Sequence, residues 1–102
     1  ALDRDRVGVV LNSGGGGLPS FEASVRALAA RGARTVPPLA IPLYVPNMAA
    51  SQVSIAFGIT GPSLAGVGAC AAGVMAVTDG VRLIQDGWAD VVVAGAAEAL
   101  LT

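Results

Sequence analysis

No charged side chain occurs between Arg34 and Asp79, and this uncharged stretch limits what the chain can form. A helix that spans a membrane needs about 20 consecutive, mostly apolar residues. Four prolines between positions 37 and 46 break the first part of the stretch, and a Gly-Pro pair at 61–62 breaks the rest. The start of the chain has no charged segment followed by an apolar run, which a signal peptide would require. We therefore expect no membrane span.

The chain is also unusually apolar for its length. Hydrophobic residues make up 54% of its 102 positions and charged residues 13%, whereas an average globular domain carries about 25% charged residues. A small domain has more surface per residue than a large one, so it should be more polar than average. We therefore expect residues 1–102 to be part of a larger domain, without an internal boundary, whose remainder covers the apolar surface.

Charge and cysteine content exclude several kinds of site. The net charge is −1, with six basic residues, all of them arginine, and no histidine. A nucleic-acid partner calls for a clustered basic face, and one cysteine without histidine provides neither an internal disulfide nor a metal site. The glycines at 14–17 lack the lysine of a phosphate loop and the acidic residue of a dinucleotide fingerprint. We expect a structural glycine turn, no cofactor, no metal, no nucleic acid, and a reducing, cytoplasmic setting.

The first half of the chain predicts one strand and two helices. The short apolar run at 7–11 is typical of a buried strand. Ser20 is a candidate N-cap for a helix that stops at Gly32. Asn47 is a candidate N-cap for a second helix, which ends at Gly58.

The middle and the second half predict the rest of an α/β fold. The proline-rich segment 37–46 predicts an extended, buried loop, because proline disfavours both helices and central strands. A short strand within 62–69, a helix from Cys70 to about Asp86 and a strand at 91–94 form a strand–helix–strand unit, which predicts a mostly parallel sheet. One face of this helix carries Val74, Val77, Val81 and Ile84.

Cys70 lies where the predicted short strand gives way to a helix. Free cysteines are often buried and behave as small hydrophobic side chains. The surrounding glycines, however, permit the sharp turn of a nucleophile elbow, which exposes one side chain. The start of a helix also favours a thiolate, and its N–H groups can hold an oxyanion. From the residues alone, core filling and nucleophilic catalysis both remain open.

Segments 6–17, 45–73 and 76–99 carry a resemblance to a known enzyme family. They read "RVGVVLNSGGGG", "VPNMAASQVSIAFGITGPSLAGVGACAAG" and "AVTDGVRLIQDGWADVVVAGAAEA". Together they resemble the β-ketoacyl-acyl carrier protein synthases, the condensing enzymes of fatty acid and polyketide synthesis. The resemblance covers essentially the whole chain but only a minority of such a domain.

The resemblance implies a fold, a reaction and partners. The fold would be a layered, thiolase-type α/β fold with a strand–nucleophile-elbow–helix–strand unit, and residues 1–102 would be a partial N-terminal half. Cys70 would accept an acyl group from acyl carrier protein, with its own N–H contributing to the oxyanion hole. A malonyl thioester would then lose carbon dioxide and condense with that acyl group. The enzyme would be a homodimer, or a heterodimer with a related subunit.

The resemblance also assigns weaker roles to other residues. Tyr44, Val45 and Met48 fall in a region that lines the acyl pocket and the dimer interface of the family, with core packing as the alternative. Apart from the resemblance, Glu98 is a conspicuous charge beside an apolar strand, and an ion pair or a hydrogen bond to downstream residues is favoured over a catalytic role.

The sequence departs from the family pattern in several respects, among them Ala71 and Ala72, near which a hydroxyl residue is common, and Ser51, which replaces a frequent glycine. Gly68 stands two residues before the cysteine, where threonine is usual. The family completes its site with two histidines and a lysine, and this chain has none. The 102 residues alone are therefore expected to supply a nucleophile without the base that assists decarboxylation.

Three rival interpretations remain. A non-catalytic elongation-partner subunit of the same fold fits Gly68 but not Cys70, because such subunits typically lose the cysteine. A thiolase, or an initiating synthase that uses coenzyme A esters, would differ in its downstream histidines. An α/β interaction module would use Cys70 only as a structural residue.

Overall fold

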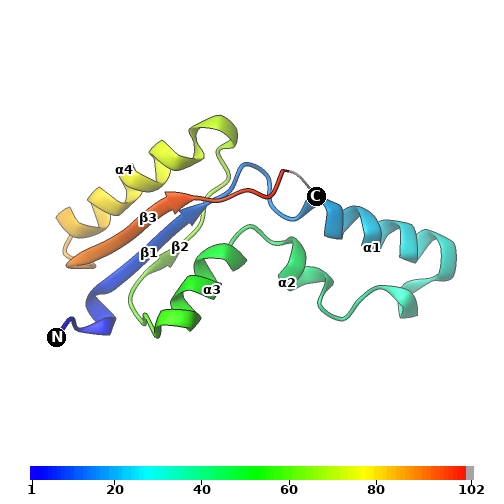
Figure 1. Cartoon of the computed structure of the whole chain (residues 1–102), viewed down its shortest axis with the longest axis horizontal. Coiled ribbons are helices and arrows are strands. Elements are labelled where there is room, and N and C mark those ends of the chain that lie inside the picture. The colour runs from blue at the N-terminus through cyan, green and yellow to red at the C-terminus, as the bar shows by residue number, and fades with distance from the viewer. Residues whose placement is uncertain (101–102) are drawn as a thin grey trace.

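A computed structural model of the chain describes residues 1–100, which form an α/β fold around a parallel sheet (Figure 1). Strand β1 (Val7–Asn12) lies in the middle, between β2 (Ser63–Leu64) and β3 (Val91–Ala96). Both neighbours run parallel to β1. The predicted first and last strands and the parallel sheet are thus confirmed. The strand expected within 62–69 shrinks to two residues, and β1 separates it from β3.

Two helices cover the sheet, one on each face (Figure 1). Helix α3 (Met48–Phe57) begins and ends where Asn47 and Gly58 predict, although the Asn47 side chain makes no capping hydrogen bond. Helix α4 (Ala72–Gln85) follows a short 3₁₀ turn that contains Cys70, so the predicted helix begins two residues later than expected.

Helix α4 contacts the sheet through its smallest residues. Ala72, Ala76 and Gly80 are buried, and a Cβ atom added at Gly80 would lie only 3.2 Å from the Val92 side chain. A larger residue at this position would therefore push the helix away from β3. The predicted valine face points the other way: Val74 is 74% exposed, and Val77, Val81 and Ile84 are also exposed.

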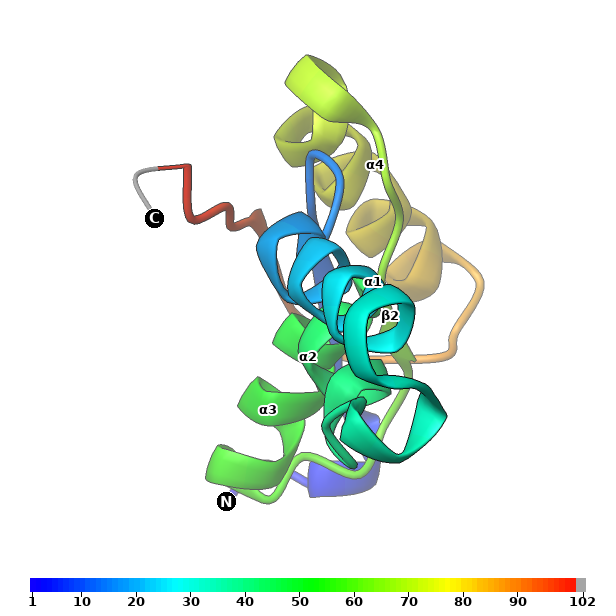
Figure 2. The same ribbon diagram turned by 90° about the vertical axis from the view of Figure 1, so that its right-hand side faces the viewer.

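The segment between β1 and α3 projects beyond the sheet (Figures 1 and 2). Helix α1 (Leu18–Arg31) packs against the short helix α2 (Ala40–Tyr44). The predicted N-cap at Ser20 is wrong, because α1 begins at Leu18 with Gly17 as its cap. Pro19 explains the earlier start, since the fixed φ angle of proline suits the first turn of a helix.

The prediction of an extended, buried loop at 37–46 is also wrong. Residues 40–44 form α2, and the segment is largely exposed. Pro42 is accommodated because it lies in the first turn of α2, where a backbone N–H has no partner within the helix. The remaining prolines flank the helix rather than interrupt it.

The projecting segment gives the chain an open shape. Its radius of gyration is 15.9 Å, against about 13 Å for a compact domain of this length. Its accessible surface is 6685 Å², against about 5,200 Å² for a folded monomer of this mass. Within residues 1–100, no helix combines the length and apolar character needed to cross a membrane.

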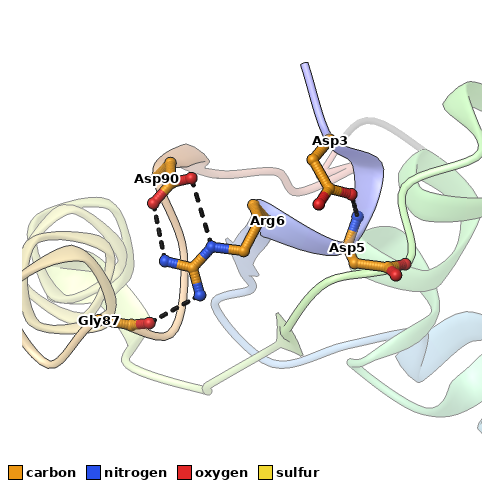
Figure 3. A network of polar contacts seen from close by, with 5 residues as sticks. All are labelled: Asp3, Asp5, Arg6, Gly87 and Asp90. Carbon is orange, nitrogen blue, oxygen red and sulfur yellow. Dashed lines mark hydrogen bonds and ion pairs between the residues drawn. The ribbon is translucent and has the colours of Figure 1, made fainter. Parts of the chain in front are cut away.

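An ion pair joins the start of β1 to the turn before β3 (Figure 3). The Arg6 guanidinium donates to both Asp90 carboxylate oxygens, at 2.7 and 3.3 Å, and to the Gly87 carbonyl at 2.8 Å. The hydrogen bond from Arg6 lowers the pKa of Asp90 below its ordinary value. The contact therefore anchors one end of the β1–β3 pair.

The Arg6→Ala variant should be less stable than the wild type at neutral pH, and this difference should shrink in acid. A lowered carboxyl pKa contributes stability that is present above the ordinary pKa and is lost as the pH falls through the folded-state value. Unfolding free energies of both proteins between pH 7 and pH 2.5 measure the effect. Arg82→Ala serves as the control, because its exposed contact with Asp79 spans 3.7 Å. A difference that is constant with pH would contradict the role assigned to Asp90.

Candidate functional site

The loops that follow the three strands meet at one edge of the sheet. Parallel strands bring their carboxyl ends to the same edge, and open α/β sheets bind ligands in the crevice there. In this chain the edge holds the glycine turn 14–17 after β1, the Cys70 turn after β2, and residues 97–100 after β3. An open groove of about 560 Å³ lies among them. Its lining includes Gly14, Gly15, Gly16, Leu18, Cys70, Ala96, Glu98 and Leu100.

Cys70 sits on a tight turn with an exposed side chain. The turn is a 3₁₀ helix of Ala69–Ala71, directly before α4. Ala69 has a φ angle of +44°, which places it in the left-handed region. This conformation costs a residue with a Cβ atom roughly 1–2 kcal/mol. The strained residue therefore stands directly before the cysteine, and the exposure expected of the turn is observed.

Gly68, the departure from the family pattern, has a steric explanation. A Cβ atom at this position would overlap the Met75 sulfur and would lie 3.2 Å from the Cα atom of Ala72. Met75 projects from the first turns of α4 and fills the space that a side chain at position 68 would need. Glycine at 68 and methionine at 75 are thus a matched pair.

Glu98 binds the glycine turn. One carboxylate oxygen accepts hydrogen bonds from the Ser13 hydroxyl at 3.0 Å and from the N–H groups of Gly14 and Gly15 at 2.6 and 3.1 Å. The Ser13 hydroxyl in turn accepts from the Gly16 N–H at 2.8 Å. The structural hydrogen bond expected of Glu98 is confirmed, but its partners lie upstream in the sequence.

Val45 and Met48 line a second groove, apart from Cys70. This groove measures about 640 Å³ and shares Gly16 and Glu98 with the first groove. Tyr44 lies in neither lining; its ring contacts Phe21, with the ring centres 4.9 Å apart. The structure thus brings Val45 and Met48 together in one groove, and Cys70 lies in the other groove, which shares Gly16, Ala97 and Glu98 with it. The binding roles of all three residues stay predictions.

The glycine turn acts as a close-packed corner. A Cβ atom at Gly17 would overlap the Leu43 carbonyl oxygen, and Gly16 has a φ angle of +87°. The turn therefore has the structural role expected of it. In the part of the chain that the structure describes, no cluster of three or more His, Cys, Asp or Glu residues could hold a metal ion.

A family model described as "Beta-ketoacyl synthase, N-terminal domain" matches residues 1–102. The chain belongs to the β-ketoacyl synthase family. The 3-oxoacyl-[acyl-carrier-protein] synthase 2 of Staphylococcus aureus is 41% identical over 98 residues, which are 96% of this chain and 24% of that protein. The protein of the same name from Synechocystis sp. is 38% identical over 99% of this chain and 24% of its own length. The chain thus spans about a quarter of the length of these relatives.

Solved ketosynthase structures share the fold. The ishigamide ketosynthase/chain length factor superposes with a TM-score of 0.89 and 28% identity, over 98% of this chain and 28% of that one. The second structure is a type II polyketide synthase acyl-carrier protein in complex with its ketosynthase bound to the hexaketide (AntDE:AntF). It superposes with a TM-score of 0.83 and 27% identity, over 98% of this chain and 29% of that one. These matches confirm the thiolase-type α/β fold that the resemblance implies.

Replacing Gly68 with alanine should destabilise the full-length protein that contains this segment. The cost should be about 1 kcal/mol of unfolding free energy, at the low end for overpacking, because the half-exposed Met75 side chain can move aside, and Met75→Ala in the same protein should recover part of the loss. The four proteins of this double-mutant cycle give the coupling from their unfolding free energies. Gly73→Ala is the matched control, because its added Cβ atom would meet only Ala96, at 3.9 Å. Additive effects of the two substitutions would contradict the matched pair.

Proposed function

We propose that this chain supplies the nucleophile-bearing part of a β-ketoacyl synthase, an acyltransferase of fatty acid or polyketide synthesis. One observation carries the proposal: Cys70 is exposed, on a strained turn at the start of α4, and faces an open groove at the carboxyl ends of parallel strands. Family membership supplies the chemical context. In this proposal residues 1–102 are a partial N-terminal half of the catalytic domain.

The first stage is transfer of an acyl group to Cys70. The thiolate attacks the carbonyl carbon of an acyl thioester carried by acyl carrier protein, and a new carbon–sulfur bond forms. The carrier's carbon–sulfur bond breaks, and its sulfur leaves with the electron pair and takes up a proton. In this proposal the Cys70 N–H, at the start of the helical segment, contributes to stabilising the oxyanion that develops on the carbonyl oxygen.

The second stage is decarboxylative condensation. A malonyl thioester loses carbon dioxide, and the electron pair left on its α-carbon attacks the carbonyl carbon of the Cys70 thioester. The carbon–sulfur bond to Cys70 then breaks, and the thiolate is restored. The chain contains no histidine and no lysine, so the groups that assist decarboxylation would come from elsewhere in a longer protein. By itself the chain is expected to be inactive in condensation.

The proposed partners follow from the same family context. They are acyl carrier protein loaded with acyl or malonyl groups, and a second ketosynthase-like subunit, identical or related, in a cytoplasmic enzyme. The apolar outer face of α4, with Val74, Val77 and Val81 exposed, offers a surface for the remainder of the domain. The presence of Cys70 favours this reading over a non-catalytic partner subunit.

Cys70 should be the site of covalent labelling by acyl donors in the full-length protein. Incubation with hexanoyl-acyl carrier protein should add one hexanoyl group, located by intact-mass analysis and peptide mapping. The Cys70→Ala variant should add none, because alanine offers no nucleophile. Equal labelling of the wild type and this variant would remove the proposed function.

The two grooves predict different effects of donor length. Gly15 lines the Cys70 groove, and a Cβ atom there would meet only Leu18, at 3.8 Å. Gly15→Val should therefore fold normally but slow acylation by hexanoyl and longer donors about tenfold more than acylation by acetyl donors, because the added side chain occupies the groove. Val45→Phe, in the second groove, should slow only the longest donors.

Acylation rates against donor length, together with melting curves, measure both effects. A uniform loss across all donor lengths in both variants would remove the acyl-chain role of these grooves. It would leave the labelling of Cys70 untouched.

A further inference from the structure

One buried polar side chain touches both ends of the loop that carries Cys70. Asn12, the last residue of β1, is 0% exposed. Its carboxamide oxygen accepts a hydrogen bond from the Gly66 N–H at 2.6 Å, and its nitrogen donates to the Ala72 carbonyl at 3.0 Å. Gly66 precedes the Cys70 turn and Ala72 follows it.

The backbone of Ser13, directly after β1, holds only the first end of this loop. Ser13 donates its N–H to the Gly66 carbonyl at 3.0 Å and accepts from the Gly68 N–H at 3.2 Å. Any residue other than proline could make these main-chain contacts. The distance across the turn, from Gly66 to the first residue of α4, is spanned by the Asn12 side chain. A carboxamide is suited to this task because it combines an acceptor and a donor.

We propose that Asn12 is a positioning residue for Cys70. Its two hydrogen bonds hold the loop entry and the first turn of α4 at a fixed separation, and this fixes where the strained turn presents the thiol. The inference rests on the proposed function, in which Cys70 attacks an acyl thioester. Loss of the contact should slow acylation of Cys70 about tenfold to a hundredfold, because a displacement of about 1 Å at a reacting group has effects of this size.

Two variants test the proposal in the full-length protein. Asn12→Leu has a side chain of similar size and removes both hydrogen bonds, so it should slow acylation by hexanoyl-acyl carrier protein at every pH. Asn12→Asp introduces a carboxyl group whose pKa burial raises. When protonated, this group can still accept from Gly66 and donate to Ala72. When ionised, it has no proton to donate and repels the carbonyl oxygen.

The ratio of variant to wild-type acylation rate should therefore depend on pH for Asn12→Asp. It should be near one in mild acid and should fall as the introduced carboxyl group ionises. The titratable groups on the surrounding loops are Cys70, on the loop that Asn12 holds, and Glu98, which binds Ser13 and the glycine turn. Both are present in the wild type and in the variant, and Asn12→Leu, which introduces no charge, separates loss of the hydrogen bonds from an effect of the new carboxylate on Cys70. Asn47→Asp, at an exposed position, is the matched control and should give a flat ratio near one.

The outcomes separate this inference from the proposed function. Alkylation of Cys70 by iodoacetamide, measured alongside acylation, should follow the same pH-dependent ratio in Asn12→Asp. A folded Asn12→Leu variant whose rates match the wild type would overturn the positioning role. An Asn12→Asp variant whose ratio stays flat and near one in both assays would overturn it as well. A wild-type protein that is alkylated but never acylated at Cys70 would instead overturn the proposed function, while the alkylation ratio would still decide the role of Asn12.

Discussion

Strand β1 is the element on which the rest of the structure depends. Val9 and Val10, on its two faces, are almost completely buried, because α4 covers one face and α3 the other. Parallel neighbours pair with it on both sides, β3 along its whole length and β2 at Val9 and Val10. A one-residue shift in the register of this strand would exchange the side chains of its two faces and disturb the packing of both helices. The positions of the three loops at its carboxyl end are fixed by the same constraint.

Close approach of backbone and small side chains is the second organising feature. Gly80 lets α4 lie against β3, Gly17 lets the turn pass the Leu43 carbonyl, and Gly68 leaves room for Met75. The consequence for α4 is a reversal of the usual arrangement, since its bulky valines face away from its own sheet. A helix with small residues toward one layer and large residues toward the outside is suited to packing between two layers. This arrangement agrees with a chain that spans only part of the length of its relatives.

Local signals predicted much of the fold. The helix between Asn47 and Gly58 has the expected bounds because glycine at its end adopts the left-handed conformation that stops a helix, with a φ angle of +61°. The start of α1 differs from the prediction because two local signals indicate different first residues. Ser20 indicates a later start as an N-cap, whereas Pro19 favours a position in the first turn, and the helix begins at Leu18. Helix α2 contradicts the expected loop because proline breaks a helix only in its interior. Pro42 lies in the first turn of α2, where it is tolerated.

The site was predicted less completely, for a physical reason. Cys70 could be singled out because a nucleophile has a recognisable residue type and a recognisable surrounding of glycines. The contacts of Asn12 and Glu98 join residues more than fifty positions apart, and no periodicity or spacing within one sequence reveals such pairs. The separation of Val45 from Cys70 is likewise a tertiary property, since it depends on how the glycine turn packs against Tyr44 and Glu98.

The strain at Ala69 explains why these long-range contacts gather around Cys70. A residue with a Cβ atom persists in the left-handed region only where its surroundings determine its conformation. Here the loop entry is held by main-chain bonds to Ser13, the exit by Asn12, and the interior by the packing of Met75 against Gly68. Each of these contacts leaves the turn fewer ways to relax. The exposure of the thiol is thus a property of the whole carboxyl edge of the sheet rather than of the cysteine and its immediate neighbours.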